Sequence, residues 1–133
     1  MTTTNRQRPN PLLLAAALVY FAGALALLFA PDEILAAMRT GAGRLDAVLL
    51  QLVAAALFGF AMLDWMQRFT RTGGIYGRPI VLANLAHSLT AALSLAHGLR
   101  AGGLPAPLLG ALVAYALLAI AFGWTFFGPG PRA

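Results

Sequence analysis

The stretch RPIVLANLAHSLTAALSLAHGLR, residues 78–100, decides the fold class of this chain. Residues 79–99 carry no formal charge, and a run of about 20 such residues spans the hydrocarbon core of a bilayer. The same run holds most of the polar groups expected at membrane depth: Asn84, His87, Ser88, Thr90, Ser94 and His97. Such groups are costly in lipid unless they face the protein interior. This helix is therefore the first place to look for a specific function.

The composition extends this interpretation to the whole chain. With 133 residues, 60% hydrophobic and 10% charged, the chain is too apolar for an ordinary soluble domain. Charged residues mark the boundaries of four apolar runs, and the runs lack the alternation of membrane strands. We expect an all-α integral membrane protein of one domain, with four transmembrane helices in a compact bundle. The predicted spans are residues 11–30, 46–66, 79–100 and 104–127, flanked by cytoplasmic tails at 1–10 and 128–133.

Residues 31–42 predict a short interfacial helix between the first and second spans. Pro31 suits the first position of a helix, and Asp32 and Glu33 favour the positive end of its dipole. The apolar residues Ile34, Leu35 and Met38 fall on one side at helical spacing, as in a helix lying on a membrane surface. A simple capped turn between two spans is the alternative.

The nine basic residues are all arginine and are scattered over tails and loops. Without a basic stripe, nucleic acid is not an expected partner, whereas the lipid bilayer is. One side of the membrane would hold Arg6, Arg8, Arg68, Arg71, Arg78 and Arg132, and the other Arg39, Arg44 and Arg100. This asymmetry predicts a membrane protein with both termini in the cytoplasm. The first run is longer than the apolar region of a cleavable signal peptide, so we expect it to be retained.

The second span combines a small-residue ridge with two polar groups. Gln51, Ala55 and Gly59 recur at intervals of four, which predicts close approach of a neighbouring helix along this ridge and a hydrogen bond from Gln51. Asp64 lies near the cytoplasmic end of the span. An ion pair with Arg68, four residues later, would explain Asp64 adequately, and a pair with Arg78 on the next span is the alternative.

The third span carries the candidate site. At about 100° per residue, Asn84, His87, Ser88 and Ser94 share roughly a third of the helix circumference, and Thr90 and His97 extend this arc. The opposite side holds Leu82, Leu85, Leu89 and Leu93. We therefore expect the polar stripe to face the interior and the leucines to face lipid. His87 either exchanges a proton or binds a ligand, or it is a neutral hydrogen-bonding group paired with Tyr20, Tyr115 or Gln51.

Several kinds of chemistry are disfavoured, and no cofactor is predicted. The chain has no cysteine, which excludes disulfides and thiolate metal sites. His87 and His97 lie ~15 Å apart along one helix, too far to bind one haem iron within a single chain. Asp64 is the only further ligand at depth, so no metal site is expected. The loop with Gly73, Gly74 and Gly77 lacks the lysine of a phosphate-binding loop and predicts a tight turn.

The runs FGFAMLDWMQR and GGIYGRPIVLANLAHSLTAAL resemble small, mostly uncharacterised four-span bacterial membrane proteins, the DoxX-like group. The shared layout is a first span ending in a phrase like LLFAP, a short amphipathic segment and three further spans. The resemblance covers residues 12–121. Some DoxX-like proteins are similar to small subunits of quinone-linked oxidoreductases, so it implies a possible link to quinone. No catalytic or quinone motif can be carried over to individual residues.

These observations lead to one principal functional hypothesis and two alternatives. The first is a non-enzymatic accessory or interaction subunit that encloses a small lipophilic ligand. The second is an oligomeric transporter or channel, for a small solute or proton-coupled, that uses the polar stripe of the third span, and the third is a quinone-linked redox subunit. In each case we expect a homo-oligomer or a subunit of a larger membrane complex. The candidate site comprises Gln51, Asp64, Asn84, His87, Ser88 and Ser94, with Arg78 and His97 as interhelical or loop charges.

Overall fold

The computed structural model describes residues 8–38, 43–72 and 75–128, and the regular structure in these ranges is entirely helical. The helices are α1 (Pro11–Phe29), α2 (Pro31–Ala37), α3 (Arg44–Met66), α4 (Gly77–Gly102) and α5 (Ala106–Phe127). Within the described ranges, four of them (α1, α3, α4 and α5) are long and apolar enough to cross a membrane. These lengths and compositions indicate a membrane protein.

Local capping sets the helix starts. Asn10 is the N-cap of α1, and its side-chain oxygen accepts hydrogen bonds from the backbone of Leu12 at 3.0 Å and Leu13 at 3.4 Å. Helix α3 begins two residues before the predicted start, because the Asp46 carboxylate accepts a hydrogen bond of 2.7 Å from the Gly43 backbone. This contact satisfies an N–H group that would otherwise be free at the helix start.

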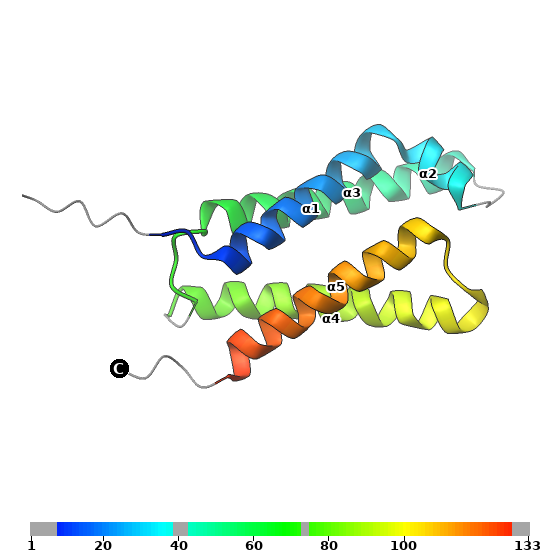
Figure 1. Ribbon diagram of the computed structural model, residues 1–133. Coiled ribbons are helices and arrows are strands. Elements are labelled where there is room, and N and C mark those ends of the chain that lie inside the picture. Colours follow the sequence, from blue (N-terminus) through cyan, green and yellow to red (C-terminus); the bar gives the residue numbers. More distant parts are fainter. Residues whose placement is uncertain (1–7, 39–42, 73–74, 129–133) are drawn as a thin grey trace, which may run out of the picture.

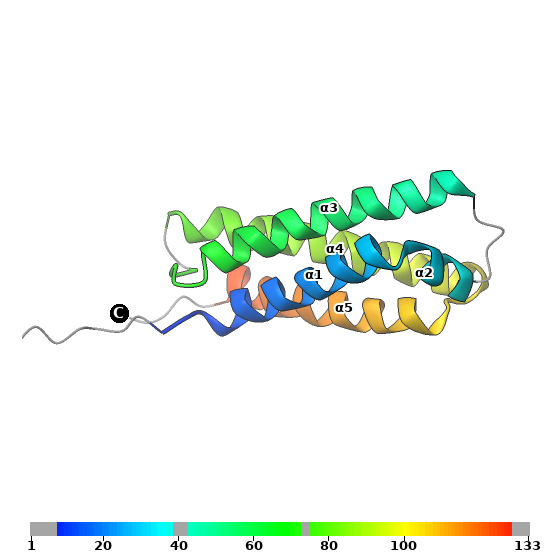
Figure 2. The ribbon, with the colours of Figure 1, turned by 90° about the horizontal axis from the view of Figure 1, so that it is seen from above.

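The long helices form two antiparallel pairs. Helix α1 packs along α3, and α4 packs along α5, whereas close backbone contacts between the two pairs are few. Figure 1 shows one pair lying above the other, and Figure 2 shows the same arrangement from above. The start of α1 and the end of α5 lie at the same end of the molecule (Figure 1). Side chains, rather than backbone proximity, therefore carry much of the contact between the pairs.

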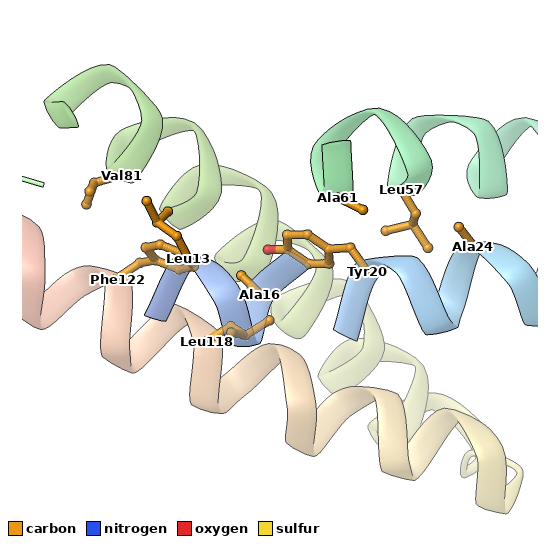
Figure 3. Packing of buried hydrophobic residues seen from close by; sticks show 9 residues of the cluster. All are labelled: Leu13, Ala16, Tyr20, Ala24, Leu57, Ala61, Val81, Leu118 and Phe122. Atoms are coloured by element: carbon orange, nitrogen blue, oxygen red, sulfur yellow. The ribbon is translucent and has the colours of Figure 1, made fainter. Parts of the chain in front are cut away.

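A hydrophobic cluster connects all four long helices. Its buried members are Leu13, Ala16, Tyr20, Ala24, Leu57, Ala61, Val81, Leu118 and Phe122 (Figure 3). Half of the cluster members on α1 and α3 are alanines (Ala16, Ala24 and Ala61), and small side chains let two helix backbones approach closely. Tyr20 is the largest fully buried side chain, and it points from α1 into the space between the pairs (Figure 3).

The small-residue ridge predicted on α3 does not make a helix contact within the described chain. Gln51, Ala55 and Gly59 are exposed, and a Cβ added at Gly59 would meet no described atom within 4 Å. The buried residues of α3 are Ala54, Leu57, Ala61 and Asp64. Within this chain the predicted contact is absent because α3 is turned to bury Asp64 and to fit Leu57 and Ala61 against α1, which places Gln51 on the outer face.

The connection into α4 includes one close approach. A Cβ added at Gly77 would overlap the backbone of Arg71 and Thr72, so this position requires glycine. Gly77 is buried, and its packing holds the start of α4 against the segment that follows α3. The remaining glycines of the predicted turn, Gly73 and Gly74, lie outside the described residues.

Candidate functional site

A buried hydrogen bond joins the two helix pairs near the end of α3. The Asn84 side-chain nitrogen on α4 donates to Asp64 Oδ1 on α3 at 2.7 Å, and also to the Ile80 carbonyl oxygen at 3.1 Å. Both Asp64 and Asn84 have no exposed surface. One turn further along α4, the Ser88 hydroxyl donates to the Asn84 carbonyl oxygen at 2.7 Å. The buried part of the site thus contains a carboxyl, an amide and a hydroxyl.

Three polar atoms in this region have no hydrogen-bond partner within the described residues. They are the Tyr20 hydroxyl on α1, Asp64 Oδ2 on α3 and Asn84 Oδ1 on α4. Buried polar atoms are nearly always hydrogen-bonded, so these three atoms, which come from three helices, are the candidate groups for contact with a bound molecule.

One aromatic or imidazole ring from each long helix meets beside these polar groups. His87 on α4 stacks on Phe60 of α3, with ring centroids 4.5 Å apart. The ring centroid of His87 lies 5.3 Å from that of Tyr20 on α1 and 5.5 Å from that of Tyr115 on α5. We call Tyr20, Phe60, His87 and Tyr115 the aromatic cluster. His87 Nε2 is 3.4 Å from the Tyr115 hydroxyl, which is long for a hydrogen bond.

The predicted polar stripe of the third span faces the interior over only part of its length. Asn84 and Ser88 are buried and His87 is half-buried, but Ser94 and His97 are exposed. The expectation that Ser94 faces the interior was therefore wrong. Four of the five buried residues of α4 (Gly77, Val81, Asn84 and Ser88) lie in its first half, and Ala92 is the fifth. Gln51 also lies on the outer face of α3, away from the buried site.

Neither predicted ion pair of Asp64 is present. Arg68 donates instead to the Trp65 carbonyl oxygen at 2.6 Å, and its guanidinium lies 4.3 Å from the centroid of the Trp65 ring. Arg78 is exposed and lies over the Phe126 ring at 5.6 Å. Both guanidinium groups remain at the helix ends, where aromatic rings contact them. Pairing with the buried Asp64 carboxylate would require a guanidinium to lose its water, which costs more free energy. Asp64 is consequently paired with an amide, not with a cation.

No metal-ligand set assembles in the part of the chain that the structure describes. Groups of three or more His, Asp or Glu side chains that could hold an ion do not occur there. His87 is half-buried in the aromatic cluster, and His97 is exposed further along the same helix. The arrangement is suited to hydrogen bonding and to ring contacts.

An apolar groove lies on the outer side of the α1–α3 pair. Its volume is about 350 Å³, and its lining residues are Ala17, Leu18, Phe21, Ala61, Met62 and Trp65. The residues with unpartnered polar atoms, Tyr20, Asp64 and Asn84, are not among those that line the groove. This volume lies within the range of pockets that hold small molecules.

Sequence reasoning missed Phe60 as a member of the site. Tyr20 and Tyr115 were expected only as hydrogen-bond partners of His87, whereas ring packing is their main contact with it. The available signal was that each long apolar run carries a ring near its middle, at Tyr20, Phe60, His87 and Tyr115. Rings at similar depth on neighbouring spans can meet, since aromatic pairs are stable at centroid distances of about 4.5–7 Å.

Comparison with known proteins adds no assignment to this geometry. No family model matches the chain, and neither a curated protein nor a solved structure matches it.

Proposed function

We propose that this chain is a small, non-enzymatic membrane protein that binds a lipophilic small molecule between its two helix pairs. The observation that carries the proposal is the set of unpartnered polar atoms on Tyr20, Asp64 and Asn84, all inside a membrane-type helical chain. A ligand that hydrogen-bonds to these atoms would remove the cost of burying them without a partner.

The proposal includes a position in the membrane. The four long helices would form a compact bundle in a bacterial inner membrane, with both termini cytoplasmic, as the arginine distribution predicts. Helix α2 would lie on the outer membrane surface: Ile34, Leu35 and Met38 are half-buried, whereas Asp32 and Glu33 are exposed. Membership of the DoxX-like group remains a hypothesis that rests on sequence layout. Reporter fusions after residue 41 and at the C-terminus test the orientation, and an outward C-terminus would contradict it.

Association with further copies or with other membrane proteins is part of the same proposal. Gln51 has an exposed side chain on a predicted span, and an amide facing lipid is costly without a partner. This observation favours an accessory or interaction subunit, in which a neighbouring chain would cover the outer face of α3. Crosslinking in native membranes tests it, and a chain that remains monomeric there would contradict this part.

Ligand binding is tested by purification in mild detergent followed by native mass spectrometry. We expect the wild-type protein to retain a small molecule. The double variant Asp64→Leu/Asn84→Leu should lose it, because the substitution replaces both buried polar partners with apolar groups of similar size. Replacing a buried polar pair in this way is often neutral for stability, so the double variant remains a usable protein.

The matched control is Gln51→Leu, which replaces an exposed polar group on the same helix as Asp64. This variant should retain the same molecule as the wild type. The proposal would be contradicted if the wild type retains no small molecule, or if the double variant retains the same molecule in the same amount. In the second case the molecule would bind elsewhere on the protein.

A further inference from the structure

The apolar groove on the α1–α3 pair is open on the outer side of the chain. Its floor is formed by Ala17 and Ala61, which are each 3% exposed. Its walls are exposed apolar side chains, two from each helix: Leu18, Phe21, Met62 and Trp65. Both helices are long and apolar enough to cross a membrane, so the open side of the groove would face the hydrocarbon of the bilayer.

The groove has the depth of one leaflet. Phe21 follows Pro11, the first residue of α1, by ten residues, which corresponds to about 15 Å along a helix. This is half of a hydrocarbon core of about 30 Å. At the shallow end, Trp65 is the last residue but one of α3. The groove therefore extends from the end of the molecule where α1 begins and α3 ends to about the middle of the membrane (Figure 1).

A guanidinium group lies at the shallow end of the groove. The Cζ atom of Arg68 is 4.3 Å from the ring centroid of Trp65, a wall residue, and 4.6 Å from that of Phe69. The Asn10 backbone N–H donates to the Arg68 carbonyl oxygen, so Arg68 also lies against the start of α1. Its side chain donates to the Trp65 carbonyl oxygen and forms no ion pair with the described residues. A guanidinium has five N–H donors, and most of these remain available to an anion.

The described residues offer no accessible carboxylate at this end of the molecule. Their acidic side chains are Asp32, Glu33 and Asp46, on α2 and the first turn of α3 at the opposite end, and Asp64, which is buried (Figure 1). Arg8 before α1 and Arg71 after α3 are both exposed and add to the positive charge near Arg68. Such an excess of arginine at a membrane surface attracts anionic lipid headgroups.

We propose that the groove binds one anionic phospholipid, with its phosphate at the Arg68 guanidinium and one acyl chain between the walls of the groove. The depth of the groove accounts for the chain, and the unpaired guanidinium beside Trp65 accounts for the headgroup. This site lies on the outer face of the α1–α3 pair and does not depend on the interior site. A protein helix that covers the groove is the competing occupant, and it predicts no preference among lipids.

The test compares two lipids with the same acyl chains, anionic phosphatidylglycerol and zwitterionic phosphatidylcholine. Each is titrated into the full-length protein in mild detergent, and native mass spectrometry measures the affinity for the first lipid bound. We expect wild type to bind phosphatidylglycerol at least ~5-fold more tightly, the effect of about one arginine near the headgroup.

Two variants separate the headgroup from the chain. Arg68→Gln removes the charge and should lower the affinity for phosphatidylglycerol about 5-fold while leaving that for phosphatidylcholine unchanged. Arg100→Gln, at the exposed end of α4, is its control and should behave as wild type. Phe21→Ala removes a wall and should weaken both lipids at least ~3-fold, whereas Leu117→Ala, exposed on α5, should weaken neither.

Equal affinities of the wild type for the two lipids, or an unchanged preference in Arg68→Gln, would overturn the assignment of the headgroup to Arg68. Unchanged affinities in Phe21→Ala would overturn the assignment of the acyl chain to the groove. A wild-type protein that binds neither lipid would overturn the whole site, and the interior site would be unaffected by that result.

Discussion

The ring of His87 lies flat against the ring of Phe60, with centroids 4.5 Å apart and an interplanar angle of 22°. This stack connects α4 to α3, two helices that belong to different pairs and have few close backbone contacts. The hydrogen-bonding contact of His87, between its Nε2 and the Tyr115 hydroxyl, is 3.4 Å long. Ring packing is therefore the stronger of the two interactions at this position.

At position 87, ring stacking should contribute more to the stability of the protein than hydrogen bonding. We expect His87→Phe, which keeps the stack, to retain stability, and His87→Gln, which keeps only hydrogen-bonding capacity, to lose about 0.5–1.5 kcal/mol. Thermal unfolding in detergent measures both variants. If glutamine is as stable as histidine and phenylalanine is not, the hydrogen bond to Tyr115 is the dominant contact.

Removing the Asn84 amide should weaken the junction between the pairs. Asn84→Leu leaves the buried Asp64 carboxyl without its donor, so we expect a loss of about 1–3 kcal/mol in unfolding free energy. Ser94→Leu is the matched control on the same helix, because Ser94 is exposed and its replacement leaves no buried partner. A loss of the same size in both variants would show that Asn84 contributes no specific interaction.

Two substitutions to leucine on α3 distinguish the observed helix contact at Ala61 from the predicted contact at Gly59. Ala61 is 3% exposed at the contact with α1, so Ala61→Leu should destabilise the protein by about 1–3 kcal/mol through overpacking. Gly59 faces open space, and Gly59→Leu should have little effect on the isolated chain. The reverse order of stabilities in a thermal melt would mean that α3 packs along the Gly59 ridge after all.

The close approach at Gly77 predicts an unusually sensitive glycine. Gly77→Ala places a methyl group against the Arg71 and Thr72 backbone, and the required shift should cost about 1–3 kcal/mol. Gly110→Ala on α5 is the control, since a Cβ there meets nothing within 4 Å of the described atoms, and alanine is the better helix former. Equal melting temperatures for the two variants would contradict the tight packing at the start of α4.

The positions of the long helices could be predicted from sequence because hydropathy sums over about 20 residues and tolerates local ambiguity. Which side of each helix packs against its neighbours could not be predicted equally well. Consecutive alanines at 54–56 place small residues on several sides of α3. The spacing of Gln51 and Gly59 therefore predicted a ridge on one side, whereas the observed contact uses Leu57 and Ala61.

The candidate site was predictable where a polar residue has a tertiary partner at its own depth. Asn84 is buried because Asp64 lies opposite it, and sequence alone marked both residues as polar groups within apolar runs. Ser94 follows the same helical spacing but has no such partner among the described residues and is exposed. The stack of Phe60 on His87 depends on the register between two helices from different pairs, which periodicity within one helix does not specify.

The most direct test of the interior site is a ¹³C NMR titration of aspartate carboxyl signals in detergent. The chain contains only Asp32, Asp46 and Asp64, and Asp64→Asn identifies the signal of the buried carboxyl. On addition of a lipophilic probe, either cationic phenyltrimethylammonium or neutral tert-butylbenzene, the Asp64 signal should shift and saturate, whereas those of the exposed Asp32 and Asp46 should not move. An Asp64 signal that stays fixed with both compounds would contradict a ligand site between the helix pairs.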